Sequence, residues 1–160
     1  MALPTAGSGA DQDQFWPMPK FYFSVDIDDL TDLPFLEISG LEVEADNISY
    51  RHGNDPSFGT IQMPGIKKSG NLTLKKGVFA NDDTYQALIS KIALNTYKRM
   101  TVVIRLLDEN TEPRMTWQLK NAFPLKYSST EMNSESSEAA IESIEFTHQG
   151  IEQLLFFFYI

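Results

Sequence analysis

The sequence predicts a mainly β protein: a small antiparallel β-barrel or sandwich with one α-helix on its flank. Several short segments alternate polar and apolar residues, which is the period of a half-buried strand. Turn residues separate these segments, and one stretch alone spaces its apolar residues as a helix does. The 160 residues suit a single domain, and a hydrophobic fraction of 42% suffices for a core.

Composition and charge exclude several classes of function. The formal net charge of -9 argues against specific binding to nucleic acid, because such binding needs clustered Lys and Arg. The sequence has no cysteine, so disulfides, thiolate metal sites and cysteine nucleophiles are absent. No stretch reaches the roughly 20 apolar residues of a spanning helix, and no signal peptide is recognisable. We therefore expect no membrane insertion by the subunit alone.

The chain divides into three parts. Residues 1–14 are small and polar and are expected to form a flexible arm. Residues 15–150 form the domain, and residues 151–160 form an apolar C-terminal tail. The tail ends in the run Leu154–Ile160, which would be an aggregation hazard in water. We expect this run to be buried, in this subunit or in a partner.

The first two predicted strands flank an Asp-rich loop. Phe21–Ile27 alternates strictly. Phe35–Ala45 also alternates but changes phase at Ser39 and Gly40. Because a strand can switch faces only by gaining a residue, we predict a β-bulge there. After the bulge, the face away from the core carries an acidic row: Glu42, Glu44 and Asp46.

The stretch around which the other segments are arranged is Met63–Gly77. The dipeptide Pro64-Gly65 predicts a turn, and the following strand places Leu72 and Leu74 on its core face. The connection before it, Asn47–Gln62, is longer than an ordinary hairpin loop. A loop of this length is commonly a contact element.

The second half of the chain contains the helix and the remaining strands. Helix-capping residues at 81–84 precede an apolar stripe at helical spacing, formed by Tyr85, Leu88, Ile89 and Ile92. Thr101–Leu107 and Arg114–Lys120 are predicted to pair as a hairpin. The last strand is Ala139–His148, with Ile144 and Phe146 facing inward.

No residue pattern indicates catalysis or a cofactor. The two imidazoles, His52 and His148, have no nucleophile motif beside them. Lys68-Ser69 lacks the glycine that precedes the lysine of a phosphate-binding loop. The acidic row is typical of the wet face of a sheet rather than of paired catalytic carboxylates. We therefore expect no enzymatic activity and no cofactor.

Charged clusters have simpler explanations than ligand binding. Asp26, Asp28 and Asp29 contain ligands that a hard cation prefers, but a solvated strand end explains them better, and we expect no metal. The acidic total favours salt bridges or solvation over nucleic-acid contact for the lysines that flank the Met63–Gly77 strand. These lysines are Lys67, Lys68, Lys75 and Lys76.

Ordered segments between Phe21 and Gly150 resemble one family of proteins. They are FYFSV at 21–25, FLEISGLEVE at 35–44, YRHG at 50–53, MPGIKKSGNLTLKKG at 63–77, WQLKNAFPLK at 117–126 and IEFTHQG at 144–150. Together they resemble the tail-tube protein family of contractile-tail phages, which includes the inner-tube proteins of contractile injection systems. Each segment alone is weak evidence for the resemblance, whereas the whole set in this order is specific.

The resemblance implies a structural role. Members form hexameric rings with a continuous inner sheet, and the rings stack into a hollow tube inside a contractile sheath. Sheath contraction propels the tube, which conducts effector protein or DNA. The implied partners are further copies of the chain, the sheath protein, baseplate or hub proteins, tube-terminator proteins and cargo. Assembly would take place in the cytoplasm of the producing cell, as part of a phage tail or of an injection particle that is released.

Two sets of residues gain a role from this resemblance. The long loop would contact the next ring through Tyr50, Arg51, His52, Gly53, Asp55 and Phe58. The acidic row Glu42, Glu44 and Asp46 would line the lumen, where negative charge keeps DNA or acidic cargo from adhering.

Alternative functions stay open from the sequence. The same fold would serve as a tube-initiator or adaptor ring at the baseplate. A different class is a monomeric β-barrel whose pocket binds an apolar ligand, lined by Phe21, Phe23, Phe35 and Trp117. The apolar tail has three candidate docking partners: the sheath, a neighbouring subunit and the baseplate partner of the first ring.

Overall fold

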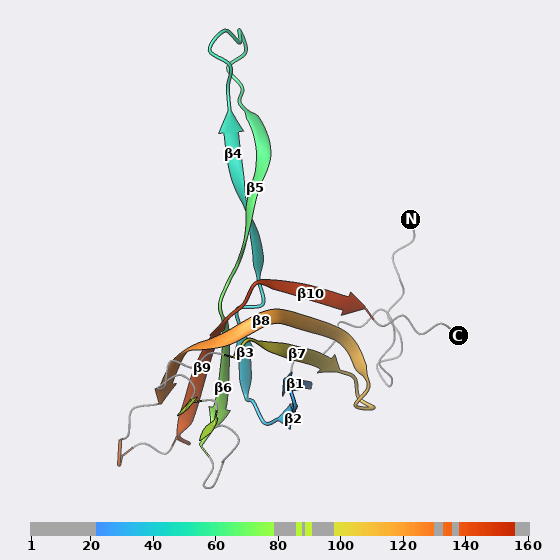
Figure 1. Ribbon diagram of the computed structural model, residues 1–160, viewed down its shortest axis with the longest axis vertical. Coiled ribbons are helices and arrows are strands. Elements are labelled where there is room, and N and C mark those ends of the chain that lie inside the picture. The colour runs from blue at the N-terminus through green and yellow to red at the C-terminus, as the bar shows by residue number, and fades with distance from the viewer. Residues whose placement is uncertain are drawn as a thin grey trace, which may run out of the picture.

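The computed structural model describes residues 22–78, 86–87, 89–90, 98–129, 133–135 and 138–155. They form an 8-stranded sheet and a separate 2-stranded hairpin that projects from it (Figure 1). The strands are β1 (Phe23–Ile27), β2 (Leu30–Leu33), β3 (Glu37–Ser39), β4 (Val43–Tyr50), β5 (Ile61–Ser69), β6 (Leu72–Gly77), β7 (Met100–Leu107), β8 (Pro113–Ser129), β9 (Ile141–Thr147) and β10 (Gly150–Leu155). All pairings are antiparallel, so the predicted mainly β, antiparallel class is confirmed.

The long strand β8 joins the two halves of the sheet, whose order is β2-β1-β7-β8-β9-β6-β3, with β10 also paired to β8. The first part of β8, up to Ala122, pairs with β7, and Phe123–Ser129 pairs with β9. Near the end of the first part, where the register with β7 shifts, Asn121 has φ 52°, a left-handed conformation that asparagine adopts more readily than most residues. β8 therefore changes its pairing partner directly after a break in the regular strand conformation.

The core draws its side chains from both halves of the sheet. Leu72 and Leu74 of β6 and Ile144 and Phe146 of β9 are all 0% exposed, which confirms the predicted alternation. Each such side chain stabilises the fold by about 1.5–3 kcal/mol relative to an exposed position. The other core residues are Val25, Ile27, Phe35, Met100, Val102, Ile104, Leu119 and Ala122.

A closed barrel is the part of the fold prediction that is wrong. Within the described residues the sheet ends at β2 on one side and at β3 on the other, and no pairing joins these two strands. β3 is short, spanning Glu37–Ser39, because the chain leaves the sheet directly afterwards. Hydrophobic periodicity tells which face of a strand is apolar, and it does not tell whether two end strands meet.

The predicted strand Phe35–Ala45 is divided into β3 and β4, which belong to different sheets. The phase change at Ser39 and Gly40 marks this division rather than a bulge within one continuous strand. Gly40 has φ 91°, and a Cβ placed on it would lie 1.9 Å from the carbonyl oxygen of Asn71. Glycine is required here because both the backbone conformation and the close approach exclude a side chain.

The predicted long loop Asn47–Gln62 is largely part of a hairpin. β4 continues to Tyr50 and β5 begins at Ile61, so residues 51–60 alone connect them. The Asn and Ser residues of this segment predict a loop, but here they occur within β4. The strand tolerates them because both of its faces remain solvated. Such residues are depleted in strands that pack on both sides.

The predicted turn at Pro64 and Gly65 is also wrong, because both residues lie inside β5. In a two-stranded ribbon each strand has a free edge, so a proline without an N–H is tolerated. The register shifts beside Gly65: Ala45 pairs with Lys67, whereas Asn47 pairs with Pro64. The breaker residues thus mark a bulge in the hairpin and not a reversal of the chain.

The predicted helix lies mostly outside the described residues. Residues 86–87 and 89–90 have a helical backbone, and the Ser90 hydroxyl donates to the Gln86 carbonyl at 2.9 Å. Ile89 packs against the core. A helix that flanks the sheet stays a prediction. The described part of the chain contains no helix that is long and apolar enough to cross a membrane.

The C-terminal strands return along β8. The predicted hairpin of β7 and β8 is confirmed by its register, in which Ile104 lies opposite Trp117. β9 then pairs with the second part of β8 and β10 with the first. The arm 1–14 and the end of the tail, 156–160, lie outside the described residues. Leu154 is 42% exposed, so the sheet itself does not bury the start of the apolar run.

Candidate assembly interface

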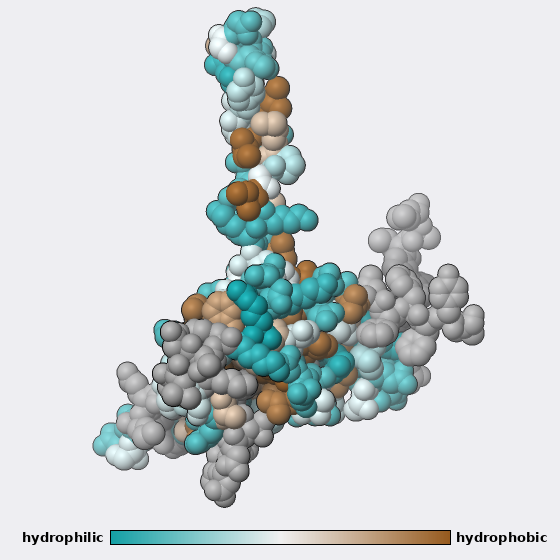
Figure 2. Space-filling model, in the orientation of Figure 1, coloured by the Kyte–Doolittle hydropathy of each residue, from teal (hydrophilic) through white to brown (hydrophobic). Residues whose placement is uncertain are grey.

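The β4–β5 hairpin carries an apolar face that no other described part of the subunit covers. Ile48 lies opposite Met63, and Tyr50 lies opposite Ile61. Residues that are directly opposite or two apart share a face of a ribbon, so these four side chains form one apolar surface, here called the apolar hairpin face. They are 50%, 41%, 48% and 51% exposed, respectively. Figure 2 shows apolar side chains along the hairpin where it stands clear of the body.

The opposite face of the hairpin is polar and internally bonded. The Gln62 side-chain oxygen accepts from the Asn47 amide at 2.6 Å and from the Ser49 hydroxyl at 2.8 Å. The Gln62 amide donates to the Thr60 hydroxyl at 2.9 Å. The hairpin is therefore amphipathic: one face satisfies its polar groups by itself, and the other leaves apolar surface in water.

The loop at the end of the hairpin, residues 51–60, is organised by its own polar groups. The Asp55 carboxylate accepts from the Ser57 N–H at 2.9 Å, and this hydrogen bond holds the pKa of Asp55 below its usual value. The Arg51 guanidinium donates to the Asp55 carbonyl at 3.5 Å. The Tyr50 and His52 rings meet edge to face with their centroids 4.9 Å apart.

This loop contains the residues predicted to contact the next ring. The structure brings Tyr50, Arg51, His52 and Asp55 together in the contacts just described. A Cβ on Gly53 would meet nothing within 4 Å. Phe58 is 98% exposed, and an aromatic side chain presented so fully is a feature of interaction surfaces. Contact with another ring stays a proposal.

The predicted acidic row lies at the base of the hairpin. Glu44 pairs in register with Lys68, and the Lys68 ammonium lies 2.8 Å from the Asp46 carboxylate. Glu42 lies in the link before β4, where its backbone carbonyl accepts from the Gly70 N–H at 3.3 Å. Lys68 thus compensates part of the charge of the row. Which way the row faces in an assembly stays a proposal.

The root of the hairpin is fixed to the body by contacts between distant segments. The His148 Nε2 lies 2.9 Å from the Gly70 carbonyl oxygen, at the point where β9 ends and β10 has yet to begin. The Asn71 amide donates to the Glu145 carboxylate at 2.6 Å. With the close approach of Gly40 to Asn71, these contacts set the direction in which the hairpin leaves the sheet.

Strand edges offer a second surface for assembly, which the sequence did not locate. Among the described residues, β10 pairs with β8 alone, β2 with β1 alone and β3 with β6 alone. Each therefore presents one edge of backbone N–H and C=O groups that another strand can pair with. The apolar run that begins at Leu154 is the one signal in the sequence for the β10 edge, and this run predicts burial but does not indicate a strand.

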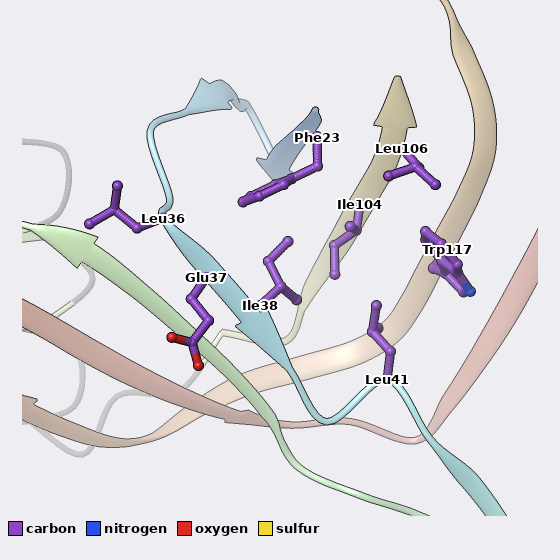
Figure 3. A pocket seen from close by; sticks show the side chains of 8 residues that line it. All are labelled: Phe23, Leu36, Glu37, Ile38, Leu41, Ile104, Leu106 and Trp117. Atoms are coloured by element: carbon purple, nitrogen blue, oxygen red, sulfur yellow. The ribbon is translucent and has the colours of Figure 1, made fainter. Parts of the chain in front are cut away.

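An open apolar pocket lies between β3 and the strands β1, β7 and β8 (Figure 3). Of the residues predicted to line a ligand pocket, Phe23 and Trp117 do line it. Phe35 belongs instead to the buried core at 8% exposure, and Phe21 lies outside the described residues. The other lining residues are Leu36, Glu37, Ile38, Leu41, Ile104 and Leu106.

Two of the three aspartates considered for a cation, Asp26 and Asp28, have partners within the subunit. The Asp26 carboxylate pairs with Arg105 and also accepts from the Asp32 N–H at 2.9 Å. The Asp28 carboxylate accepts from the Thr101 N–H at 2.8 Å. Within the described residues, no group of three or more His, Cys, Asp or Glu could hold a metal ion. These carboxylates shape the start of the sheet.

One cluster of ionisable groups lies in the sheet around a buried lysine. Lys76 is 2% exposed and pairs in register with Glu142. Burial lowers the pKa of Lys76, and the Glu142 carboxylate opposes this shift. The Tyr127 hydroxyl donates to Glu142 at 3.1 Å, and burial followed by the Glu142 contact raises the pKa of Tyr127. The cluster joins β6, β8 and β9.

Comparison with known proteins gives a consistent result. Residues 19–152 match the model of a family described as T4-like virus tail tube protein gp19. The chain is similar to one in the sheath-tube complex of an extracellular contractile injection system, PVC, in the extended state, with 32% identity, a TM-score of 0.78, and coverage of 88% of this chain and 93% of that chain. A comparison with curated protein sequences gives no match.

Two further solved structures are similar. A chain of the tube-terminating cap of the anti-feeding prophage has 30% identity and a TM-score of 0.80, with coverage of 94% of this chain and 99% of that chain. Hcp1 from Flavobacterium johnsoniae has 11% identity and a TM-score of 0.53, with coverage of 83% of this chain and 94% of that chain. At this identity the likeness to Hcp1 concerns the fold alone.

Proposed function

Because this chain belongs to the T4-like virus tail tube protein family, we propose that its copies form hexameric rings that stack into the hollow inner tube of a contractile particle. The chain is a structural tube subunit and a component of a phage tail or injection-system particle. The family is structural, so the function to be explained is assembly rather than a reaction.

The observation that carries this proposal is the uncovered apolar hairpin face. An isolated two-stranded hairpin is marginally stable in water at best, and its apolar side chains gain free energy only when another surface covers them. Ile48, Tyr50, Ile61 and Met63 are all about half exposed in the single chain. A second copy of the chain supplies the missing cover, since a tube offers the same neighbour to every subunit.

Each element then has a role in the assembly. The apolar hairpin face packs on a neighbouring subunit, and the loop 51–60 contacts the next ring with Phe58 as its most exposed anchor. The free edge of β10 pairs with a strand of the adjacent copy and extends the sheet around the ring. A repeated head-to-tail contact of this kind generates closed rings or filaments.

The wider assembly follows by analogy with the relatives. One relative comes from a sheath-tube complex and another from a tube-terminating cap, so we propose sheath, terminator and baseplate proteins as partners. The subunits assemble in the cytoplasm of the producing cell, and particles are later released. The acidic row at Glu42, Glu44 and Asp46 faces the lumen, where it keeps acidic cargo moving without specific nucleic-acid binding.

Placing asparagine on the apolar hairpin face tests the proposal. Ile48→Asn with Ile61→Asn removes apolar area at two paired rows without touching the core. We expect the concentration needed for tubes to rise at least tenfold, which corresponds to about 1.4 kcal/mol. The unfolding free energy of the subunit should stay within about 0.5 kcal/mol. Negative-stain microscopy and denaturant unfolding measure the two quantities.

The matched control changes the polar face of the hairpin at the pair between the two substituted rows, Ser49 and Gln62. Ser49→Ala with Gln62→Ala removes hydrogen bonds that lie in water, and tubes should form at the wild-type concentration. If the variant Ile48→Asn with Ile61→Asn formed tubes at the same concentration as the wild-type protein, the proposed contact through the apolar hairpin face would be refuted. Wild-type protein that remains monomeric at high concentration would refute tube formation itself.

A further inference from the structure

The apolar pocket has the size and chemistry of a docking site. Its volume is about 460 Å³, within the range of about 300–1,000 Å³ typical of ligand pockets. In Figure 3 the side chains of Phe23, Ile104, Leu106 and Trp117 project from one side, and Ile38 and Leu41 project from the other. The Glu37 carboxylate at its rim is paired with the Lys75 ammonium at 2.9 Å. The pocket therefore favours an apolar occupant.

The register of the sheet brings the end of the described chain close to this pocket. The backbone of Leu155 lies opposite Met115 in β8, Met115 lies opposite Leu106 in β7, and Leu106 lies opposite Phe23 in β1. Neighbouring strands are about 4.8 Å apart, so Leu155 lies about 10 Å across the sheet from the pocket-lining Leu106. The chain thus leaves β10 in the same row as two residues that line the pocket.

The residues that follow Leu155 have the length and composition to fill it. Their sequence is FFFYI at 156–160, which is apolar throughout. An extended chain advances about 3.3–3.6 Å per residue, so this segment reaches about 17 Å. We propose that residues 156–160 fold over the end of β8 and insert their aromatic side chains into the pocket of the same subunit.

The same subunit is the favoured acceptor because of the short tether. A segment joined directly to β10 meets the pocket at an effective concentration of millimolar order, without the entropy cost of bringing two chains together. Insertion would bury both the pocket lining and an apolar tail that is an aggregation hazard when exposed. This inference does not depend on tube formation, since it concerns the single subunit.

Cysteine cross-linking tests the inference directly, because the natural chain contains no cysteine. In the variant Ile38→Cys with Phe157→Cys, mild oxidation should form an intramolecular disulfide in the unassembled subunit. The control variant Ile66→Cys with Phe157→Cys places the first cysteine on the hairpin, at a position 77% exposed, and should stay reduced. No disulfide in the pocket variant would overturn the proposal.

Mixing two single-cysteine chains separates this arrangement from its alternative. If Ile38→Cys chains and Phe157→Cys chains cross-link into dimers, while the double variant forms no intramolecular bond, the tail belongs to the pocket of another copy and the proposal is wrong. The experiment is run on the Ile48→Asn, Ile61→Asn background. Failure of tube assembly therefore cannot be confused with failure of the tail to dock.

Tryptophan fluorescence gives a second measurement that needs no cross-link. The chain has 2 tryptophans, so Trp16→Phe leaves Trp117, at the pocket, as the only tryptophan to be excited selectively. Ending the chain at Leu155 should shift its emission to longer wavelength and let an apolar dye bind. Unchanged emission, or equal dye binding by the full chain, would mean that the tail leaves the pocket open and would overturn the proposal.

Discussion

β6 in the body and β4 in the hairpin are both strands of alternating sequence, yet their apolar residues have opposite surroundings. Leu72 and Leu74 of β6 are 0% exposed, whereas Ile48 and Tyr50 of β4 are 50% and 48% exposed. Among the described strands, β6 lies between β3 and β9, and β4 pairs with β5 alone. Alternation therefore identifies the apolar face of a strand but not the chain that will cover it. In β6 the cover is the subunit's own core, and in β4 we propose that it is another subunit.

The largest expected difference between the two regions is the change in unfolding free energy when one phenylalanine of each is replaced by alanine. Phe146 is 0% exposed and Phe58 is 98% exposed. Phe146→Ala leaves a cavity in the core and should cost about 3–5 kcal/mol of unfolding free energy, a large part of the roughly 5–15 kcal/mol of a typical domain. Phe58→Ala should change it by less than about 0.5 kcal/mol. Denaturant unfolding of the unassembled subunit measures both.

The same pair should behave in the opposite way when the assembly of folded subunits is measured. Phe58→Ala is expected to raise the concentration needed for tubes about tenfold, or about 1.4 kcal/mol. Phe146→Ala should change this concentration only because a smaller fraction of the subunits is folded and able to assemble. If Phe58→Ala destabilised the isolated subunit as much as Phe146→Ala, the division of the molecule into body and hairpin would be wrong.

The sequence predicted the body better than the hairpin, for physical reasons that particular residues make clear. Leu72, Leu74, Ile144 and Phe146 were placed correctly because burial of alternate residues is a local pattern. The exit of the chain at Gly40 depends on its approach to the Asn71 carbonyl, a contact that no local pattern encodes.

Assembly features were harder still to place. The dipeptide Pro64-Gly65 predicts a turn from local sequence alone, whereas its place inside β5 depends on the free edge of that strand. The length of the predicted loop Asn47–Gln62 indicates a contact element, which stays a prediction, and this length does not reveal the apolar hairpin face. Ile48 and Ile61 fell inside a stretch whose Asn, Ser and Gly content indicated a loop, so their common face emerged only from the register.

An intermediate effect is expected at the two glycines that bracket the hairpin. Gly40 has φ 91°, and a Cβ there would lie 1.9 Å from the Asn71 carbonyl oxygen, whereas one on Gly53 would meet nothing within 4 Å. Gly40→Ala combines a left-handed conformation, which costs about 1–2 kcal/mol for an L-residue, with a backbone clash. We expect a loss of at least that size together with poor tube formation.

Gly53→Ala is the control at the other end of the hairpin. It should leave the unfolding free energy of the isolated subunit unchanged, since the tip offers room for a methyl group within the chain. Denaturant unfolding and microscopy are applied to the pair together. A Gly40→Ala protein as stable as Gly53→Ala would mean that the hairpin root can relax, and that its direction is not fixed by the contact with Asn71.

The smallest expected effect is on the pH dependence of stability, and it distinguishes two turns that are each organised by an aspartate. At the β7–β8 turn the Asp108 carboxylate accepts from the Glu112 N–H at 3.0 Å, the Asn110 N–H at 2.9 Å and the Arg114 Nε at 2.7 Å. The Glu112 hydrogen bond is the main cause that lowers the pKa of Asp108. At the hairpin tip, hydrogen bonds from Ser57, chiefly from its N–H, lower the pKa of Asp55.

The sign of the pH effect follows from the direction of these shifts. A carboxyl group whose pKa is lower in the folded state contributes stability above its unfolded value, and that stability is lost as the pH falls through the folded pKa. For both groups the loss therefore occurs below pH 3.8, the ordinary value. The Asp108 turn joins two core strands, so its loss should lower the unfolding free energy of the subunit. The Asp55 turn stands outside the body, so its loss should disorder only the tip.

Replacing each aspartate by asparagine separates the two turns. Asp108→Asn keeps an acceptor but removes the titrating group, and it should flatten the fall in unfolding free energy that denaturant titrations record as the pH drops below 3.8. Asp55→Asn should leave that slope unchanged while altering the pH dependence of tube formation. A slope flattened by Asp55→Asn instead would show that the tip is coupled to the folding of the body. The hairpin would then be part of one cooperative unit with the core rather than an arm that awaits a neighbour.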